Sequence, residues 1–265
     1  MEHQGDFLHL LKEAGYQLPH AEPPGAPAHA HVPETHGTTV IAIRYDCGVL
    51  NVGDRRATAD NMVMYDRADK IFALDDYTLL EVSGSYARAM DIVRFLKHSF
   101  KYYRRTQLQD ISIEGKVQEV SRAIANNLPS AMQGIGAFLP IMSAYDLRAA
   151  EGRIFFYDGM GARFENKDFG AAGSGSTQIR GAFDYIIKTK GHFRQMNLEQ
   201  ALSEALVLLD IAASLDAFTA GYDKILPLVK TVSAEGITTI ADDYLRDIIG
   251  RISQYPSLIA TGYAH

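Results

Sequence analysis

The chain has 265 residues, with 26 Lys and Arg against 32 Asp and Glu, nine His, one Cys and no Trp. This length fits one large domain or two small ones, and a hydrophobic fraction of 47% supports a sizeable core and excludes wholesale disorder. A single Cys excludes an intramolecular disulfide framework and a cysteine-based zinc site, and a net charge of −6 argues against nucleic-acid binding, which requires a basic face.

Residues 1–37 differ in composition from the rest of the chain. They hold six of the nine His and five of the nine Pro, and their charge of −4 leaves only −2 for residues 38–265. Residues 6–14 have the spacing of a short amphipathic helix, and the Pro- and Ala-rich stretch that follows predicts a linker. His29, His31 and His36 could bind a metal ion, but a solvated linker is the simpler interpretation, so we expect no metal and no cofactor.

No segment of the sequence has the features of a secretion signal or a membrane span. The start is acidic, and its apolar residues are interrupted by His and Lys. The longest apolar run is interrupted by Asp210 and falls short of the roughly 18 residues that a membrane helix needs. We therefore expect a cytoplasmic protein that binds no membrane.

From residue 38 onward, the predicted strands and helices come in runs. The first strands are expected over 38–45 and 49–54, joined by a turn that contains Cys47, and over 70–74 and 78–84. Helical spacing follows over 85–105 and over 114–128, where Pro129 is expected to end the helix. The remaining elements are strands over 137–147, 153–158 and 167–173, helices over 176–190 and 197–215 (with Asn197 as N-cap), strands over 226–233 and 236–240, and a helix over 241–253.

Because strands and helices do not alternate singly, this order favours an α+β fold over a parallel doubly wound sheet. A four-layer αββα sandwich, with two stacked antiparallel sheets between helix pairs, would bury every apolar face. No internal repeat or second linker is apparent, so we expect one domain after residues 1–37, which we call the leader.

The junction between the two segments reads Gly37-Thr38-Thr39. An N-terminal Thr38 would supply a hydroxyl nucleophile and its own base, because an α-amine has a pKa of roughly 7.7–8.0. Gly37 could adopt the strained turn that presents its carbonyl to that hydroxyl. The junction alone favours an ordinary N-terminal extension, so the nucleophile interpretation depends on other motifs.

Six motifs supply that support: GTTVIAI, GVLNVGDRRAT, RADKIFALDD, VSGSYA, GSGS and DAFTAGYD. In this order and spacing they resemble a proteasome β-subunit, most closely the actinobacterial type with a long propeptide, over residues 34–240. The resemblance implies the fold of the N-terminal-nucleophile hydrolases. It also implies that residues 1–37 are a removable propeptide and that residues 38–265 form the catalytic domain.

The resemblance assigns roles to five residues around the junction. Thr38 matches the catalytic threonine, which is freed by cleavage after Gly37. Asp54 and Lys70 match the buried acid and lysine beside it, and a cationic Lys70 would lower the pKa of the Thr38 hydroxyl. Gly84 matches the glycine whose backbone N–H forms the oxyanion hole.

Further matches concern the terminal amine and the substrate. The group that supports the amine corresponds to Ser174, Asp216 and Thr219, although the family usually has Ser in place of Thr219. Thr58 matches the residue whose main chain pairs with an extended substrate. The uncharged residues that correspond to the first specificity pocket predict cleavage after large hydrophobic side chains: Ala57, Ala68, Phe72, Val82 and Tyr86. Cys47, in a predicted turn, is expected to be an incidental thiol.

The function that the resemblance implies is that of a threonine endopeptidase, without cofactor, that cleaves unfolded proteins inside a closed chamber. Two seven-membered β rings would stack back to back, capped by heptameric rings of α-subunits, and an ATP-dependent unfoldase ring would supply protein substrates. Three alternatives stay open. They are a non-catalytic ring scaffold, a small-molecule amidase, and the simpler two-ring bacterial relative of the proteasome, which usually has GDGQ where this chain has GDRR.

Overall fold

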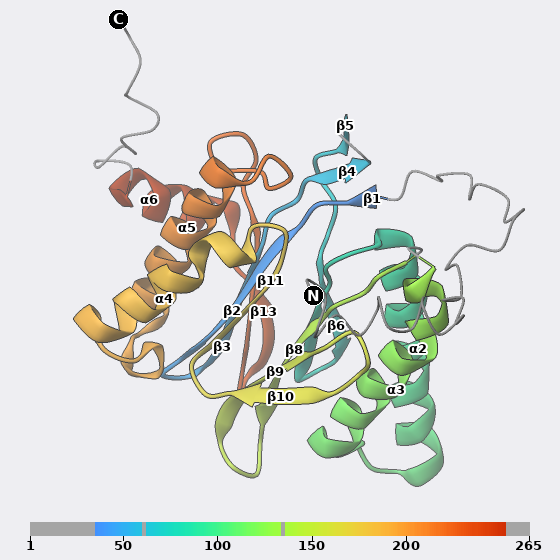
Figure 1. The fold of residues 1–265 in the computed structure, drawn as a ribbon. Helices are drawn as coiled ribbons and strands as arrows, with labels where there is room; N and C mark the ends of the chain where they lie inside the picture. Colours follow the sequence, from blue (N-terminus) through green and yellow to red (C-terminus); the bar gives the residue numbers. More distant parts are fainter. Residues whose placement is uncertain (1–34, 60–61, 134–135, 253–265) are drawn as a thin grey trace, which may run out of the picture. The chain divides into compact units, whose positions relative to one another are not determined.

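The computed structural model describes residues 35–59, 62–133 and 136–252 (Figure 1). Contacts divide the chain into residues 1–33 and 34–265, and the description below concerns the second unit alone. The predicted helix over 6–14, the linker, His29 and His31 lie outside the described residues. For residues 35 and 36, only the backbone is described.

The first five-stranded sheet has the order β11-β2-β3-β12-β13, and every neighbouring pair is antiparallel. Its strands are β2 (Thr39–Tyr45), β3 (Gly48–Gly53), β11 (Phe169–Gly173), β12 (Leu228–Ser233) and β13 (Gly236–Thr239). The two-residue turn between β2 and β3 contains the exposed Cys47, so the predicted strand pair and its turn are confirmed.

The second five-stranded sheet has the order β10-β9-β8-β7-β6 and is also antiparallel throughout. It comprises β6 (Ile71–Asp75), β7 (Thr78–Glu81), β8 (Ile141–Asp146), β9 (Glu151–Tyr157) and β10 (Arg163–Asn166). The sequence predicts all of these strands except β10, whose partly charged segment RFEN lacks a clear apolar alternation.

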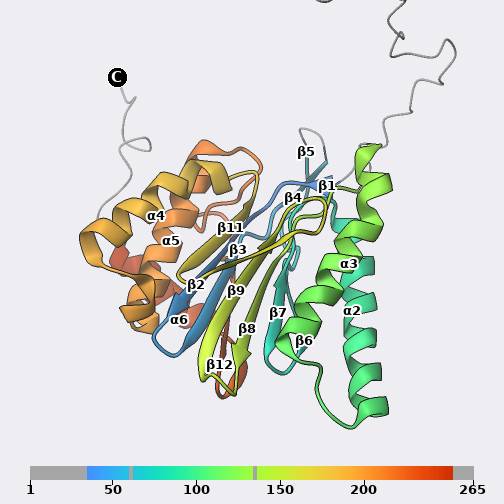
Figure 2. The same cartoon turned by 60° about the horizontal axis from the view of Figure 1, so that its bottom comes forward.

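Helices cover the outer face of each sheet (Figure 1, Figure 2). Helices α2 (Tyr86–Gln107) and α3 (Ile113–Met132) pack on the second sheet, while α4 (Ser176–Lys190), α5 (Leu198–Leu215), α6 (Asp242–Ile252) and the short 3₁₀ helix η1 (Phe193–Gln195) adjoin the first. A third apolar cluster lies between the sheets and includes Val40, Ile71 and Ile154. The predicted four-layer α+β sandwich is therefore confirmed, with three α-helices rather than a pair against the first sheet. None of the described helices is both long and apolar enough to cross a membrane.

The prediction that Pro129 ends a helix is wrong, because α3 continues through it to Met132. Proline removes one backbone hydrogen bond in a helix interior, but this proline stands only three residues from the helix end. Packing of the α3 face that includes Val117, Val120 and Ile124 against the sheet holds the helix in place. Tertiary contacts therefore override the local signal.

A small third sheet, of order β1-β4-β5, stands at the end of the sandwich that carries the junction. Its strands are β1 (Thr35–His36), β4 (Ala57–Ala59) and β5 (Met62–Tyr65). The sequence analysis missed all three. They are short, and the four apolar residues of β5 are all exposed, so no alternation of buried and exposed residues marks this strand. This sheet aligns the end of the leader, antiparallel, with β4.

Candidate active site

Thr38 immediately precedes β2 and is buried, with 5% of its surface exposed. Its Oγ1 donates a hydrogen bond of 2.5 Å to the carbonyl oxygen of Gly37. Gly37 has a φ of +96°, a region that favours glycine, and a Cβ there would lie 2.4 Å from Oγ1 of Thr58. The chain therefore requires glycine at the residue whose carbonyl faces the threonine hydroxyl.

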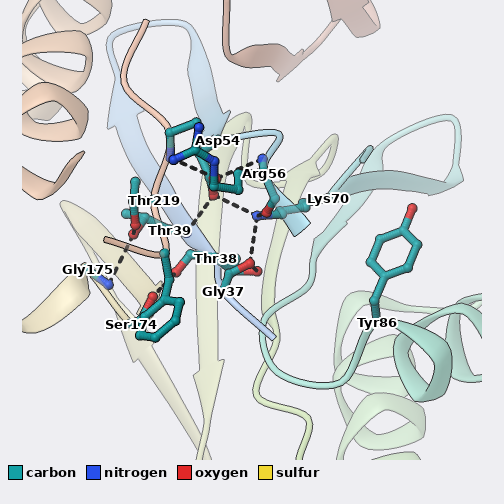
Figure 3. A network of polar contacts seen from close by, with 12 residues as sticks. Gly37, Thr38, Thr39, Asp54, Arg56, Lys70, Tyr86, Ser174, Gly175 and Thr219 are labelled. Atoms are coloured by element: carbon teal, nitrogen blue, oxygen red, sulfur yellow. Dashed lines mark hydrogen bonds and ion pairs between the residues drawn. The ribbon is translucent and has the colours of Figure 1, made fainter. Parts of the chain in front are cut away.

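The ammonium group of Lys70 points at the same carbonyl (Figure 3). Its Nζ donates to the oxygen of Gly37 at 2.9 Å, to Oδ1 of Asp54 at 2.8 Å and to the carbonyl oxygen of Arg56 at 2.5 Å. These three acceptors use all three donors of a charged lysine. Burial lowers the pKa of Lys70 from its ordinary value, and the Asp54 carboxylate opposes that shift by stabilising the cation.

The Asp54 carboxylate is held by backbone groups from three segments. Oδ1 accepts from the amide of Thr39 at 2.7 Å, and Oδ2 accepts from the amides of Arg56 at 3.0 Å and Ala220 at 3.3 Å. Its side chain is fully buried beside that of Lys70, which is 2% exposed. A buried ion pair is stable only when its remaining hydrogen-bonding groups are satisfied, and these amides fulfil that condition.

A second polar group lies on the other side of Thr38. The hydroxyl of Ser174 is 2.6 Å from Oδ2 of Asp216 and 3.2 Å from the carbonyl oxygen of Thr38. Thr219 donates to the same Asp216 oxygen at 2.6 Å, and its hydroxyl contacts that of Thr39 at 2.7 Å. In the uncut chain these residues therefore contact the carbonyl of Thr38 and the side chain of Thr39.

Gly84 lies beside Thr38 in a cavity of about 400 Å³, which Gly37 and Ser174 also line. Its φ is +94°, and a Cβ at this position would lie 2.1 Å from the carbonyl oxygen of Ala137. Glycine is therefore required here by the close approach of the neighbouring backbone. The structure thus brings Gly84 to the same cavity as the threonine.

The residues predicted for substrate binding lie around the segment that carries Lys70. Val82 donates its amide to the carbonyl of Lys70 at 2.9 Å, and the hydroxyl of Tyr86 donates to the carbonyl of Asp69 at 3.1 Å. Thr58 pairs with His36 in the β1–β4 ladder. The other predicted residues are Ala57 on β4, Ala68 in the loop before β6, and Phe72 on β6. The 400 Å³ cavity is lined by a different set of residues.

Three residues of the site were not singled out from the sequence. Thr39 and Arg56 donate hydrogen bonds from their backbone amides to Asp54. Both residues stand in motifs noted in the sequence, Thr39 in GTTVIAI and Arg56 in GVLNVGDRRAT, and these motifs could have indicated them. Gly173 has a φ of +100°, and a Cβ there would lie 2.0 Å from the carbonyl oxygen of Thr38. The GSGS motif contained this glycine, but its backbone role depends on the approach of β11 to the start of β2.

Within the described residues, no group of three or more His, Cys, Asp or Glu side chains could hold a metal ion. The polar groups at the junction are instead bonded to one another and to backbone amides and carbonyls.

Comparison with known proteins identifies the family to which this arrangement belongs. A family model described as "Proteasome subunit" matches residues 34–225. "Proteasome subunit beta" of Acidothermus cellulolyticus is 36% identical over 234 residues, which are 85% of this chain and 79% of that protein. "Proteasome subunit beta 2" of Thermomonospora curvata is 32% identical over 91% of this chain and 85% of its own. "Proteasome subunit beta" of Streptomyces griseus is 32% identical over 87% of this chain and 82% of its own length. The chain therefore belongs to the proteasome subunit family, as a β subunit of the bacterial type.

Proposed function

We propose that this chain is a threonine endopeptidase that frees its own nucleophile by cutting between Gly37 and Thr38. The observation that carries the proposal is the convergence of two groups on one carbonyl. Oγ1 of Thr38 lies 2.5 Å from the Gly37 oxygen, and Nζ of Lys70 lies 2.9 Å from the same atom. A nucleophile beside a scissile carbonyl and a cation that stabilises the developing oxyanion are two of the elements that acyl transfer uses.

In the self-cleavage step, Oγ1 of Thr38 attacks the carbonyl carbon of Gly37, and a carbon–oxygen bond forms. Lys70 stabilises the negative charge that develops on the carbonyl oxygen. The bond from that carbon to the Thr38 nitrogen then breaks, and the nitrogen takes up the proton that the hydroxyl has lost. Water hydrolyses the resulting ester, which releases residues 1–37 with a carboxylate end and leaves Thr38 with a free amine.

In the processed enzyme, the α-amine of Thr38 acts as the base for its own hydroxyl. Gly84 provides the oxyanion-hole N–H, while Ser174, Asp216 and Thr219 hold the amine in place. Pairing of β1 with β4 supports a substrate site in which an extended peptide takes the same edge beside Thr58. The uncharged residues Ala57, Ala68, Phe72, Val82 and Tyr86 would favour a hydrophobic side chain before the cut.

The proposal extends to the assembled particle. Residues 1–37 act as a propeptide that masks Thr38, and residues 38–265 are the catalytic domain. The chain forms seven-membered β rings that stack in pairs in the cytoplasm, capped by heptameric rings of α-subunits. Unfolded proteins supplied by an ATP-dependent unfoldase are degraded inside.

Co-expression with an α-subunit, followed by intact-mass measurement, tests the proposal. The wild-type chain should lose residues 1–37. Thr38→Ala should remain full length and lack peptidase activity, whereas Thr38→Ser, which keeps a hydroxyl, should still be processed. An assembled wild-type particle with a full-length chain and no peptidase activity would favour the scaffold alternative and overturn the proposal.

Substitution of the lysine tests its role separately. Lys70→Met should block both self-cleavage and peptide hydrolysis, because no cation remains beside the Gly37 carbonyl. Lys116→Met is the matched control. It removes a second buried lysine, which is bonded to Thr78 and Asp75 instead of the junction, and should be processed normally. Processing of Lys70→Met at the wild-type rate would show that the assigned role is wrong.

A further inference from the structure

No described residue of β4 lines the 400 Å³ cavity beside Thr38. Apart from the junction, its lining comes from the segment after β7, the segment before β8, β9, β11 and the residues that follow β11. In the first sheet, β11 and β3 flank β2 on opposite sides, and β3 leads through Asp54 to β4. In the second sheet, β9 lies beside the edge strand β10, and β8 and β7 separate it from β6, which follows Lys70. β4 and Lys70 therefore occupy one side of the threonine, and the cavity occupies the other.

This placement assigns a direction to a bound peptide. The residues before the junction, 35 and 36, pair with β4, so the part of a peptide that precedes the cut lies on that side. The cavity touches both Gly37 and Thr38, the two residues of the bond to be cut. An extended peptide that continues past the cut leaves on the side away from β4, where the walls of this cavity lie.

The cavity is apolar in its chemistry. Among the described residues that line it, none is charged, and its walls include Leu139, Pro140, Phe156, Tyr157, Ala171 and Ala172. Its three serine hydroxyl protons already have acceptors. Ser83 donates to the carbonyl of Leu139, Ser176 to that of Gly173, and Ser174 to Asp216. A hydroxyl has one proton to donate, so these three serines have no further proton to offer to an acidic side chain such as Asp.

An exposed aromatic pair supports the outer wall of the cavity. Phe156, on β9, stacks on Phe164, on β10, with ring centroids 5.3 Å apart and an interplanar angle of 21°. Phe156 is 36% exposed and Phe164 48%, and Leu139 on another wall is 42% exposed. Exposed apolar side chains grouped at a cavity are typical of a binding surface.

We propose that this cavity binds the side chain of the substrate residue that follows the cut, and that it prefers a large apolar or aromatic side chain there. The stack on Phe164 fixes the ring of Phe156 as one wall, and Leu139 supplies another. This inference rests on the proposed peptidase function and adds a second selection to it, on the leaving-group side of the bond.

The test uses processed, assembled enzyme and peptides that are identical up to the cut and differ only in the next residue. Leu, Phe, Gly and Asp are compared, and mass spectrometry identifies the bond that is cut. For the wild type, kcat/KM should be at least about tenfold higher with Leu or Phe than with Asp. Phe156→Ser should reduce this ratio to below about threefold, and Phe156→Tyr should retain most of it.

Two further variants guard the result. Leu139→Gln changes the cavity from another wall and should also lower the ratio, which keeps the inference testable if Phe156→Ser fails to assemble. Phe95→Ser is the matched control, because it removes an exposed aromatic residue of α2 outside the cavity and should keep both activity and ratio.

The outcomes separate the inference from the function on which it rests. If all peptides are cut and the wild-type ratio is near one, or the ratio is unchanged in both cavity variants, the inference is wrong while the peptidase function stands. If no peptide is cut and Thr38 is not freed, the proposed function fails, and this inference fails with it.

Discussion

Gly37 combines a backbone angle that disfavours side chains with a neighbour that leaves no room for one. Its φ is +96°, and the hydroxyl of Thr58 stands 2.4 Å from the place of a Cβ. The contact between the Gly37 carbonyl and the Thr38 hydroxyl therefore depends on a residue without a side chain at position 37. Strain of this kind costs on the order of 1–3 kcal/mol for other residues.

Gly37→Ala should slow self-cleavage by about tenfold or more, because the carbonyl must turn away from Oγ1 of Thr38 to relieve the clash. A time course of intact mass measures the rate. Gly181→Ala is the control. A Cβ at position 181, within α4, would meet nothing within 4 Å, so this variant should be processed normally and gain up to about 1 kcal/mol of stability. Equal rates of self-cleavage for Gly37→Ala and Gly181→Ala would show that self-cleavage does not require glycine at position 37.

Glu81 is a buried titratable residue to which the proposed mechanism assigns no role. It lies on β7 between Ile71 and Ile141 of the adjacent strands and is fully buried. In the described part of the chain, neither carboxylate oxygen has a hydrogen-bond partner. Burial raises the pKa of this carboxyl well above its ordinary value. Because the folded-state pKa is the higher one, stability is greatest below the unfolded pKa and is lost as pH rises through the folded pKa.

Glu81→Leu should therefore unfold with a free energy at least about 1 kcal/mol higher than the parent at pH 8, since it removes an unsatisfied buried group. The advantage should shrink toward pH 5, where the parent carboxyl binds its proton. Urea unfolding in a Thr38→Ala background keeps processing out of the comparison. Glu235→Leu, at an exposed position, should lack this pH dependence. An advantage for Glu81→Leu that is absent at pH 8 would contradict the assignment.

At the scale of single elements, some ends are set by local chemistry and others by packing. Helix α5 begins with a capping box. The side chain of Asn197 accepts a hydrogen bond from the amide of Gln200 at 2.9 Å, and the side chain of Gln200 accepts one from the amide of Asn197 at 3.1 Å. Helix α3, in contrast, continues through Pro129. The first boundary could be read locally, but the second depends on the sheet beneath the helix.

Asn197→Ala should lower the free energy of unfolding by about 1 kcal/mol, because the amide of Gln200 at the start of α5 loses its side-chain acceptor. Urea unfolding of the Thr38→Ala chain measures the difference. Ser203→Ala, within the same helix, removes a hydroxyl that bonds back to the carbonyl of Glu199 and should be near neutral. A loss for Ser203→Ala as large as that for Asn197→Ala would rule out a specific effect of the cap.

At the scale of the whole molecule, charge is distributed unevenly between the leader and the body. Residues 1–37 carry −4 of the net charge of −6. Loss of this segment leaves −2 on residues 38–265 and removes six of the nine His. Processing should therefore change the charge of the chain as well as its mass.

On denaturing isoelectric focusing, the processed chain should focus at a higher pH than the unprocessed Thr38→Ala chain, whose sequence gives a pI of about 5.8. The alanine substitution itself changes no charge and serves as the reference for the uncut state. A processed chain that focuses at the same pH as the reference would place the cut outside the acidic leader, and therefore away from Gly37.

The sequence by itself determined the fold class, most element positions and the family. Hydrophobic periodicity, turn residues and helix caps reflect interactions between near neighbours in the chain. For this reason α2, α4 and the β2–β3 hairpin could be predicted from the local amino-acid sequence. The ordered motifs also indicate Thr38 and Lys70 as candidate site residues.

Only the tertiary structure decided what these residues face. The contact of Lys70 with the Gly37 carbonyl joins residues 33 positions apart, and the walls of the cavity beside them come from segments that are distant in sequence. Phe156 belongs to none of the sequence motifs. The carboxylate of Glu81 lacks a hydrogen-bond partner among the described residues because its neighbours on the adjacent strands, Ile71 and Ile141, are apolar. Side-chain packing between stacked sheets depends on contacts between residues that are distant in sequence, so local sequence patterns do not predict it.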